Sequence, residues 1–187
     1  RMRRQHNRTK IGSKAERNQV YGFTEVRRLV GALGLSDHVR DRACVLFESA
    51  QEEDLLRGRS LEGFAAAAVY ATCRTSDVSR TVEEVVADAK ATNAELRAAY
   101  DALNRELGLP TGPIDPREYI PRFASELDVD EETKLRARRL LETGKRANLH
   151  SGKSPVGLAA AAIYAAAQFT PDALTQSEVA KVKRGRE

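Results

Sequence analysis

The amino-acid sequence predicts an all-α protein with two tandem domains. The first indication is a repeat: the alanine-rich segment at residues 58–71 recurs 94 residues later, at residues 152–165. The same offset, without a gap, pairs residues far outside these segments: Leu33 with Leu127, Arg42 with Arg136, Leu46 with Leu140 and Glu84 with Glu178. The second indication is the helical spacing of apolar residues in both copies. Two copies of a unit this size predict two small domains, each built around its own central helix.

Each alanine-rich segment predicts the central helix of its domain. Alanine is the best helix former, and its small side chain lets neighbouring helices approach from several sides. A helix that is apolar nearly all round belongs at the centre of a bundle. We expect these helices to begin at the N-caps Ser60 and Ser154 and to reach about Arg74 and Gln168.

Four more helices are predicted in the first domain. Apolar residues recur every three or four positions along the chain, and Ser36, Thr81 and Asn93 are the predicted N-caps of the last three helices. The approximate bounds of the four are 16–34, 36–56, 81–89 and 93–107. The last two follow each other closely, which is the layout of a DNA-binding helix-turn-helix and also of many helical bundles. Both interpretations stay open.

The second domain follows a connection rich in proline and glycine at residues 108–116, which stops the preceding helix. Its predicted helices cover 119–127, 131–149 and 154–168, and Thr175 caps a fourth. A counterpart of residues 87–107 would run past Glu187, so we expect this domain to lack a fifth helix. The predicted organisation is an arm at 1–17, a first repeat at 18–108, a linker at 109–116 and an incomplete second repeat at 117–187.

The positive charge of the chain lies at its two ends. The net charge is +4, yet residues 1–17 carry +6, residues 181–187 carry +3, and the body between them carries −5. The basic arm is either solvated or docks on nucleic acid or an acidic protein surface. No apolar run is long enough to span a membrane, and no signal peptide is visible, so we expect a cytoplasmic protein. In that compartment Cys44 and Cys73 are expected to be buried free thiols.

The sequence shows no catalytic constellation, so we expect neither an enzyme nor a cofactor. Gly152-Lys153-Ser154 matches the end of a phosphate-binding loop, but Ala147 stands where that motif needs glycine, and helix precedes it where the motif needs a strand. The three histidines lack metal-ligand spacing. These are His6, His38 and His150. A basic residue on a glycine turn beside a capping serine can still contact a phosphate backbone.

The chain resembles the core of the transcription initiation factor IIB family, most closely archaeal transcription factor B. The matching stretches span nearly the whole chain: 14–18, 54–63, 68–74, 115–123 and 151–155. The resemblance implies two tandem cyclin-like five-helix domains, the second truncated. It also implies a general transcription initiation factor that binds the complex of the TATA-box-binding protein with promoter DNA, recruits RNA polymerase and is itself a monomer.

The resemblance also assigns roles to particular residues. One turn would reach DNA downstream of the TATA element: Arg57, Gly58, Arg59 and Ser60. A second would lie at the interface with DNA and the TATA-box-binding protein: Gly152, Lys153 and Ser154. Basic residues of the first segment would run along the polymerase: Arg3, Arg4, Arg8, Lys10, Lys14 and Arg17. The zinc ribbon of the family would lie upstream, and its promoter-reading helix past Glu187.

An alternative interpretation is a cyclin-like protein-binding regulatory module, or a truncated paralogue without sequence-specific DNA binding. The acidic body and the expected loss of the recognition helix favour this alternative. The basic arm and the two basic glycine turns favour the initiation factor.

Overall fold

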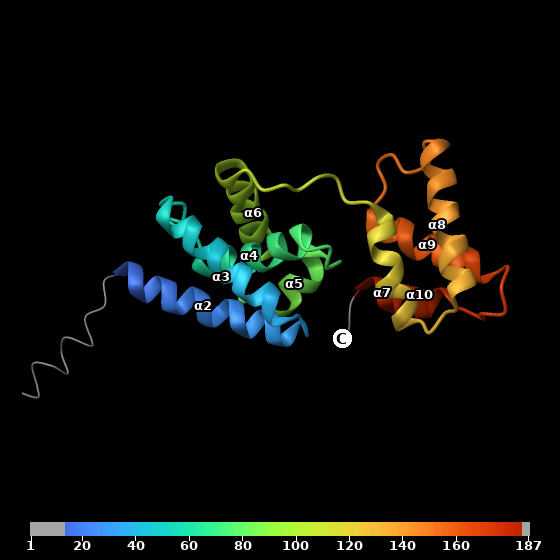
Figure 1. Ribbon diagram of the computed structural model, residues 1–187, viewed down its shortest axis with the longest axis horizontal. Helices are drawn as coiled ribbons and strands as arrows, with labels where there is room; N and C mark the ends of the chain where they lie inside the picture. The colour runs from blue at the N-terminus through green and yellow to red at the C-terminus, as the bar shows by residue number, and fades with distance from the viewer. Residues whose placement is uncertain (1–13, 185–187) are drawn as a thin grey trace, which may run out of the picture. The chain divides into compact units, whose positions relative to one another are not determined.

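The computed structural model describes residues 14–184, and the side chains of residues 14–182. The described residues form helices and connecting turns and contain no strand, which confirms the all-α prediction. They fold into two compact units, one up to Thr111 and one from Gly112 onward (Figure 1). No helix within the described range is long and apolar enough to cross a membrane.

Unit 1 is a bundle of five helices around an alanine-rich centre. The helices are α2 (Lys14–Ala32), α3 (Asp37–Glu52), α4 (Leu61–Thr75), α5 (Val82–Asp88) and α6 (Asn93–Leu107). Every residue of α4 from Gly63 to Cys73 is buried, and α2, α3 and α6 pack directly against this helix. Small side chains allow this close packing on all sides, so α4 is the central helix that the sequence predicts.

Unit 2 repeats the arrangement around a second alanine-rich helix. Its elements are η1 (Pro116–Tyr119), α7 (Ile120–Glu126), α8 (Glu131–Arg146), α9 (Pro155–Ala167) and α10 (Gln176–Arg184). The core joins Tyr119, Ile120 and Phe123 to Ile163 of α9. No counterpart of α6 is present among the described residues, and Ala161 of α9 is exposed, whereas its counterpart Ala67 in α4 is fully buried.

The two units share backbone geometry at the 94-residue offset. Positive φ angles recur in pairs: 61° at Gly34 and 52° at Asp128, 54° at Asp54 and 58° at Asn148, and 69° at Gly58 and 68° at Gly152. The capping residues also correspond, because Thr81 pairs with Glu84 and Thr175 pairs with Glu178 in the same reciprocal hydrogen bonds. The repeat therefore holds at the level of single turns.

The structure corrects several predicted helix ends. Thr92, not Asn93, is the N-cap of α6, because Thr92 and Glu95 form a capping box. Helix α3 ends at Glu52 rather than near Leu56, and α8 ends at Arg146 rather than near Leu149. In both cases the following residues turn back: the Leu55 amide donates to Ala50 and the Leu149 amide to Gly144, each over 2.9 Å. These bonds, together with the positive φ angles, close each helix early.

Two further expectations need correction. The helix predicted at 119–127 is α7, which begins one residue later at Ile120 with Pro121 in its first turn, and Tyr119 belongs to the 3-10 turn η1 that precedes it. Cys73 is buried as predicted, but Cys44 is only partly buried; both are free thiols.

Candidate nucleic-acid interface

The predicted turn of unit 1 connects α3 to the N-terminus of the central helix α4. Gly58 has a φ of 69°, a conformation that glycine adopts without the penalty other residues incur. The Arg59 amide then donates to the Leu56 carbonyl oxygen over 3.2 Å. Ser60 caps α4 by accepting a 3.0 Å hydrogen bond from the Gly63 amide. The turn thereby holds its basic residues at the N-terminus of α4.

The turn of unit 2 has the same backbone. Gly152 has a φ of 68°, and the Lys153 amide donates to the His150 carbonyl oxygen over 3.2 Å. Ser154 accepts from the Gly157 amide over 3.4 Å, a longer cap than its counterpart in unit 1. Sequence reasoning paired the two turns, and the structure gives both the same conformation.

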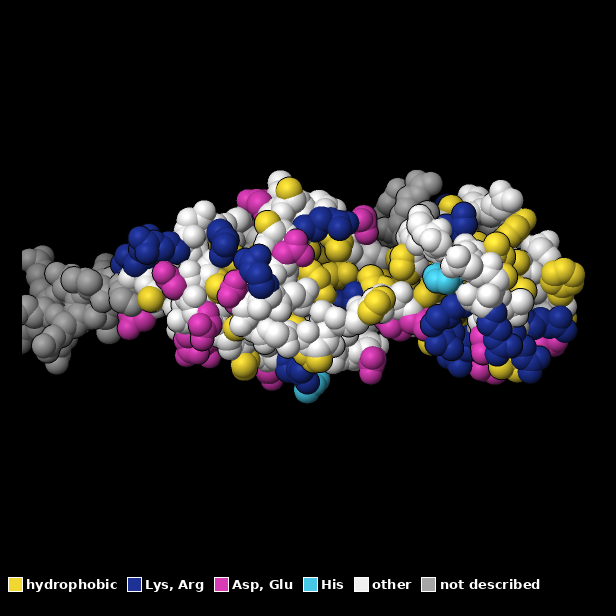
Figure 2. Space-filling view, turned by 90° about the horizontal axis from the view of Figure 1, so that it is seen from above, with side chains coloured by type: hydrophobic (Ala, Val, Ile, Leu, Met, Phe, Trp, Pro, Cys, Tyr) yellow, Lys and Arg dark blue, Asp and Glu magenta, His cyan; other side chains and the backbone are white. Residues whose placement is uncertain are grey.

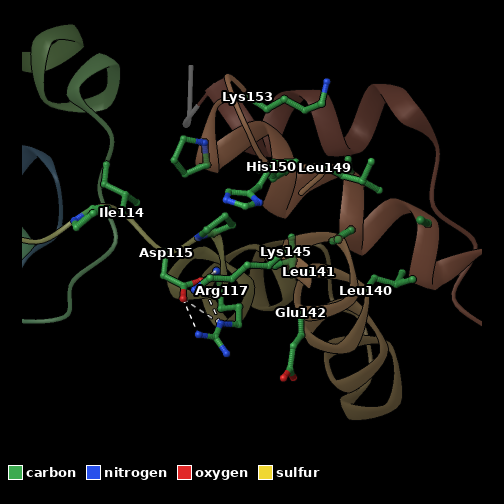
Figure 3. A pocket seen from close by; sticks show the side chains of 18 residues that line it. Ile114, Asp115, Arg117, Leu140, Leu141, Glu142, Lys145, Leu149, His150 and Lys153 are labelled. Carbon is green, nitrogen blue, oxygen red and sulfur yellow. Dashed lines mark hydrogen bonds and ion pairs between the residues drawn. The ribbon is translucent and has the colours of Figure 1, made fainter. Parts of the chain in front are cut away.

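The basic side chains of the two turns differ in how they are held. Arg57 is 85% exposed and lies 3.9 Å from Asp54, a weak surface pair. Arg59 donates from Nη1 to the Leu55 carbonyl oxygen over 2.7 Å. The Lys153 side chain has no hydrogen bond or ion pair within the described part of the chain. Its ammonium end points away from His150 and Asp115 (Figure 3).

The charges around the two helix N-termini also differ. A helix N-terminus favours a nearby anion, because its first amides and its dipole are positive there. Helix α4 already has an acid, Glu62, in its first turn, and α9 has none. The Tyr21 hydroxyl donates to Glu62 over 2.6 Å, and this hydrogen bond lowers the pKa of that carboxyl. The unit 2 turn is therefore the more favourable of the two for a phosphate.

The predicted polymerase-facing residues are only partly covered by the structure. Arg3, Arg4, Arg8 and Lys10 lie outside the described residues, as does His6. Lys14 and Arg17 lie in the first turn of α2 and are exposed.

Sequence reasoning missed a basic surface on α8. This helix has six basic and three acidic side chains, whereas its counterpart α3 has two basic and four acidic ones. Arg138 and Arg139 are exposed and have no ion-pair partner among residues 14–182. Figure 2 shows Lys and Arg side chains gathered on one face of unit 2. A comparison of charge between the two repeats would have revealed this surface.

The predicted helix-turn-helix layout is present in α5 and α6, but its second helix offers few available charges. Leu96, Ala99 and Leu103 of α6 are buried in unit 1. Arg97 on the same helix contacts Asn93 and Glu83, and Arg105 pairs with its neighbour in sequence. DNA reading by this pair of helices stays a hypothesis.

The described residues hold no group of three or more His, Cys, Asp or Glu side chains arranged to bind a metal. The two turns and the α8 surface can contact anions through backbone amides, guanidinium groups and ammonium groups.

Comparison with known proteins places both units in one family. The model of the transcription factor TFIIB repeat matches residues 15–106 and again residues 110–185. The chain is 54% identical to transcription initiation factor IIB 1 of Halobacterium salinarum, over 97% of this chain and 63% of that relative. It is 46% identical to factor IIB 6 of the same organism and 44% identical to factor IIB 2 of Haloferax volcanii. Both matches include 97% of this chain, but the chain spans only 57% and 55% of the length of those two relatives.

Proposed function

Because this chain belongs to the transcription factor TFIIB family, we propose that it acts as a general transcription initiation factor. It binds the complex of the TATA-box-binding protein with promoter DNA and recruits RNA polymerase, as archaeal transcription factor B does. The observation that carries this proposal is the pair of matching turns, each of which presents a basic residue at the N-terminus of a central helix. Members of this family are transcription factors rather than enzymes.

The DNA contacts are proposed to come from both turns. In unit 1 they involve Arg57, Gly58, Arg59 and Ser60, and in unit 2 Gly152, Lys153 and Ser154. Backbone amides and basic side chains at a helix N-terminus bind phosphate without reading bases. These contacts position the protein on DNA, and they should weaken steeply as salt rises.

The protein contacts are proposed to come from the helix faces and the first segment. Lys14 and Arg17, together with the basic residues before them, face the polymerase, and the bundles contact the TATA-box-binding protein. We propose a cytoplasmic monomer that needs no cofactor in these two repeats.

A gel-shift titration on a TATA-containing duplex tests the proposal. The chain is added with and without the TATA-box-binding protein, at several salt concentrations. We expect a supershift only when that protein is present. The double variant Arg59→Ala with Lys153→Ala should bind several-fold more weakly, and the slope of log affinity against log salt should fall by up to about two.

The matched control is Arg27→Ala with Arg42→Ala, which removes two exposed arginines from α2 and α3 and leaves both turns and the α8 surface intact. A double-turn variant that binds like the wild type would contradict the DNA contacts. Retained binding to the TATA-box-binding protein without any DNA-dependent supershift would favour the alternative, a protein-binding regulatory module.

A further inference from the structure

Unit 2 contains an apolar cavity. It has a volume of about 650 Å³ and lies between the start of the unit, helix α8 and helix α9 (Figure 3). Its walls are mostly apolar and include Ile114, Leu141, Leu158, Ala162 and Ala165. Small-molecule sites in proteins have this size and this kind of lining.

The repeat explains why the cavity exists. At the 94-residue offset, the counterparts of Arg117, Leu141 and Leu158 in unit 1 are Phe23, Phe47 and Phe64. Phe47 and Phe64 are fully buried, and Phe23 packs edge-on against Phe47 at 6.3 Å between ring centroids. Unit 1 therefore fills the equivalent space with three aromatic rings of its own.

A glycine of α8 lies at the wall of the cavity. Gly144 lines the cavity, and a Cβ atom built on it would meet no other atom within 4 Å. Its counterpart in unit 1 is Ala50, which is fully buried.

The cavity borders the face of α9 that corresponds to the α6 contact in unit 1, because Ala161 lines it and the counterpart Ala67 lies between Gly63 and Tyr70 on α4. In unit 1, α6 touches α4 at Gly63, beside Glu95, and at Tyr70, whose ring lies 5.0 Å from that of Tyr100. The counterparts in α9 are Gly157 and Tyr164, and neither lines the cavity.

The polar groups at the cavity favour an anionic ligand. Arg117 and Asp115 neutralise each other through hydrogen bonds of 2.6 to 3.1 Å. Lys145 and His150 also line the cavity, and neither side chain has a hydrogen bond or ion pair with another described residue. Figure 3 shows His150 over the middle of the cavity, the Lys145 chain reaching toward Asp115, and Glu142 pointing away.

From these observations we propose that unit 2 binds a small aromatic carboxylate in this cavity. The ring lies between Leu141, Leu158 and Ala162, in the space that phenylalanine rings fill in unit 1. The carboxylate accepts hydrogen bonds from the Lys145 ammonium and the His150 imidazole. This proposal does not depend on the DNA contacts of the turns.

Titration of the whole chain with 2-naphthoate, followed by calorimetry and by amide shifts in heteronuclear NMR spectra, tests the proposal. We expect a Kd between about 10 µM and 1 mM, as ligand efficiencies give for a molecule of this size. The neutral analogue 2-naphthalenemethanol should bind about 3- to 10-fold more weakly, and Lys145→Gln should weaken naphthoate binding by a similar factor and leave the alcohol unaffected.

Leu141→Phe restores the unit 1 side chain and should weaken naphthoate binding at least about tenfold. The matched control is Leu135→Phe, which places the same ring on an exposed position of α8 outside the cavity. Ala161→Leu narrows the cavity from an exposed position, so it tests the proposal even if Leu141→Phe fails to fold. Absence of naphthoate binding at millimolar concentration, or equal binding by wild type, Leu141→Phe and Ala161→Leu, would overturn the proposal.

Discussion

The Arg59 guanidinium donates a 2.7 Å hydrogen bond from Nη1 to the carbonyl oxygen of Leu55, within the turn that precedes α4. This bond fixes the side chain and satisfies a carbonyl oxygen of the turn between α3 and α4. Lys153 occupies the same position in unit 2, and its side chain makes no such bond within the described residues. The two turns therefore share a backbone, but they present one anchored cation and one unanchored cation.

This difference predicts unequal effects on stability. Arg59→Ala should lower the free energy of unfolding of unit 1 by about 0.5–1.5 kcal/mol, because it removes a hydrogen bond. Lys153→Ala should change the stability of unit 2 by less than about 0.5 kcal/mol, as exposed substitutions usually do. Urea unfolding followed by circular dichroism measures both. Arg57→Ala, in the same turn, is the control, and a loss of stability as large as that of Arg59→Ala would count against the anchoring bond.

Two glycines of α2 should respond oppositely to alanine. A Cβ atom on the buried Gly22 would lie 2.1 Å from Cζ of Phe47, whereas a Cβ atom on Gly31 would meet no atom within 4 Å. Gly22→Ala should therefore destabilise unit 1 by about 1–3 kcal/mol through overpacking. Gly31→Ala should stabilise it by about 0.4–1 kcal/mol through the lower entropy of the unfolded chain. Thermal unfolding of the two variants side by side checks the pair, and similar melting temperatures would contradict the packing.

Local signals predicted much of this fold. Ser60, Thr81 and Thr175 are caps whose hydrogen bonds lie within three residues, so their positions could be read from the chain. The cap of α6 could also have been found, because Glu95 follows Thr92 at the spacing of a capping box and does not fit Asn93.

Features that depend on tertiary packing were harder to predict. The early end of α3 depends on a positive φ at Asp54. Aspartate adopts this conformation more often than most residues do, but its presence in a sequence does not predict it. The cavity of unit 2 depends on which side chains of different helices meet. In the sequence, the second copy has Leu141 and Leu158 where the first has Phe47 and Phe64. This difference predicts a cavity only once the structure shows that both phenylalanine rings are buried in unit 1.

Glu25 should make unit 1 sensitive to acid. This carboxylate is 2% exposed and pairs with Arg28 at 2.6 Å and with Lys90 at 3.3 Å. The hydrogen bond from Arg28, helped by that from Lys90, lowers the pKa of Glu25 against the opposing effect of burial. A lowered pKa contributes stability that is fully present above the unfolded value of about 4.3 and is lost as pH falls through the folded value.

The stability of unit 1 should therefore decline below about pH 4.5, and Glu25→Gln should flatten that decline while lowering stability at pH 7. Urea midpoints measured between pH 7 and pH 3 check both effects. Glu16→Gln, an exposed position in the first turn of the same helix, is the control. A Glu25→Gln variant whose acid profile matches the wild type would show that this ion pair does not set the pH dependence.

The two thiols should differ sharply in reactivity. Burial raises the pKa of the Cys73 thiol to about 12, and Cys73 lies at the fully buried core of unit 1. Burial also raises the pKa of Cys44, but this residue is only partly buried. Since the thiolate is the reactive form and must be reached by the reagent, Cys44 should react with iodoacetamide at pH 8 well before Cys73. Mass spectrometry of timed samples, with Cys44→Ser as the control, should show one fast modification in wild type and none in the variant until urea unfolds unit 1. Rapid labelling of Cys73 in the folded chain would mean that α4 opens far more often than its buried packing implies.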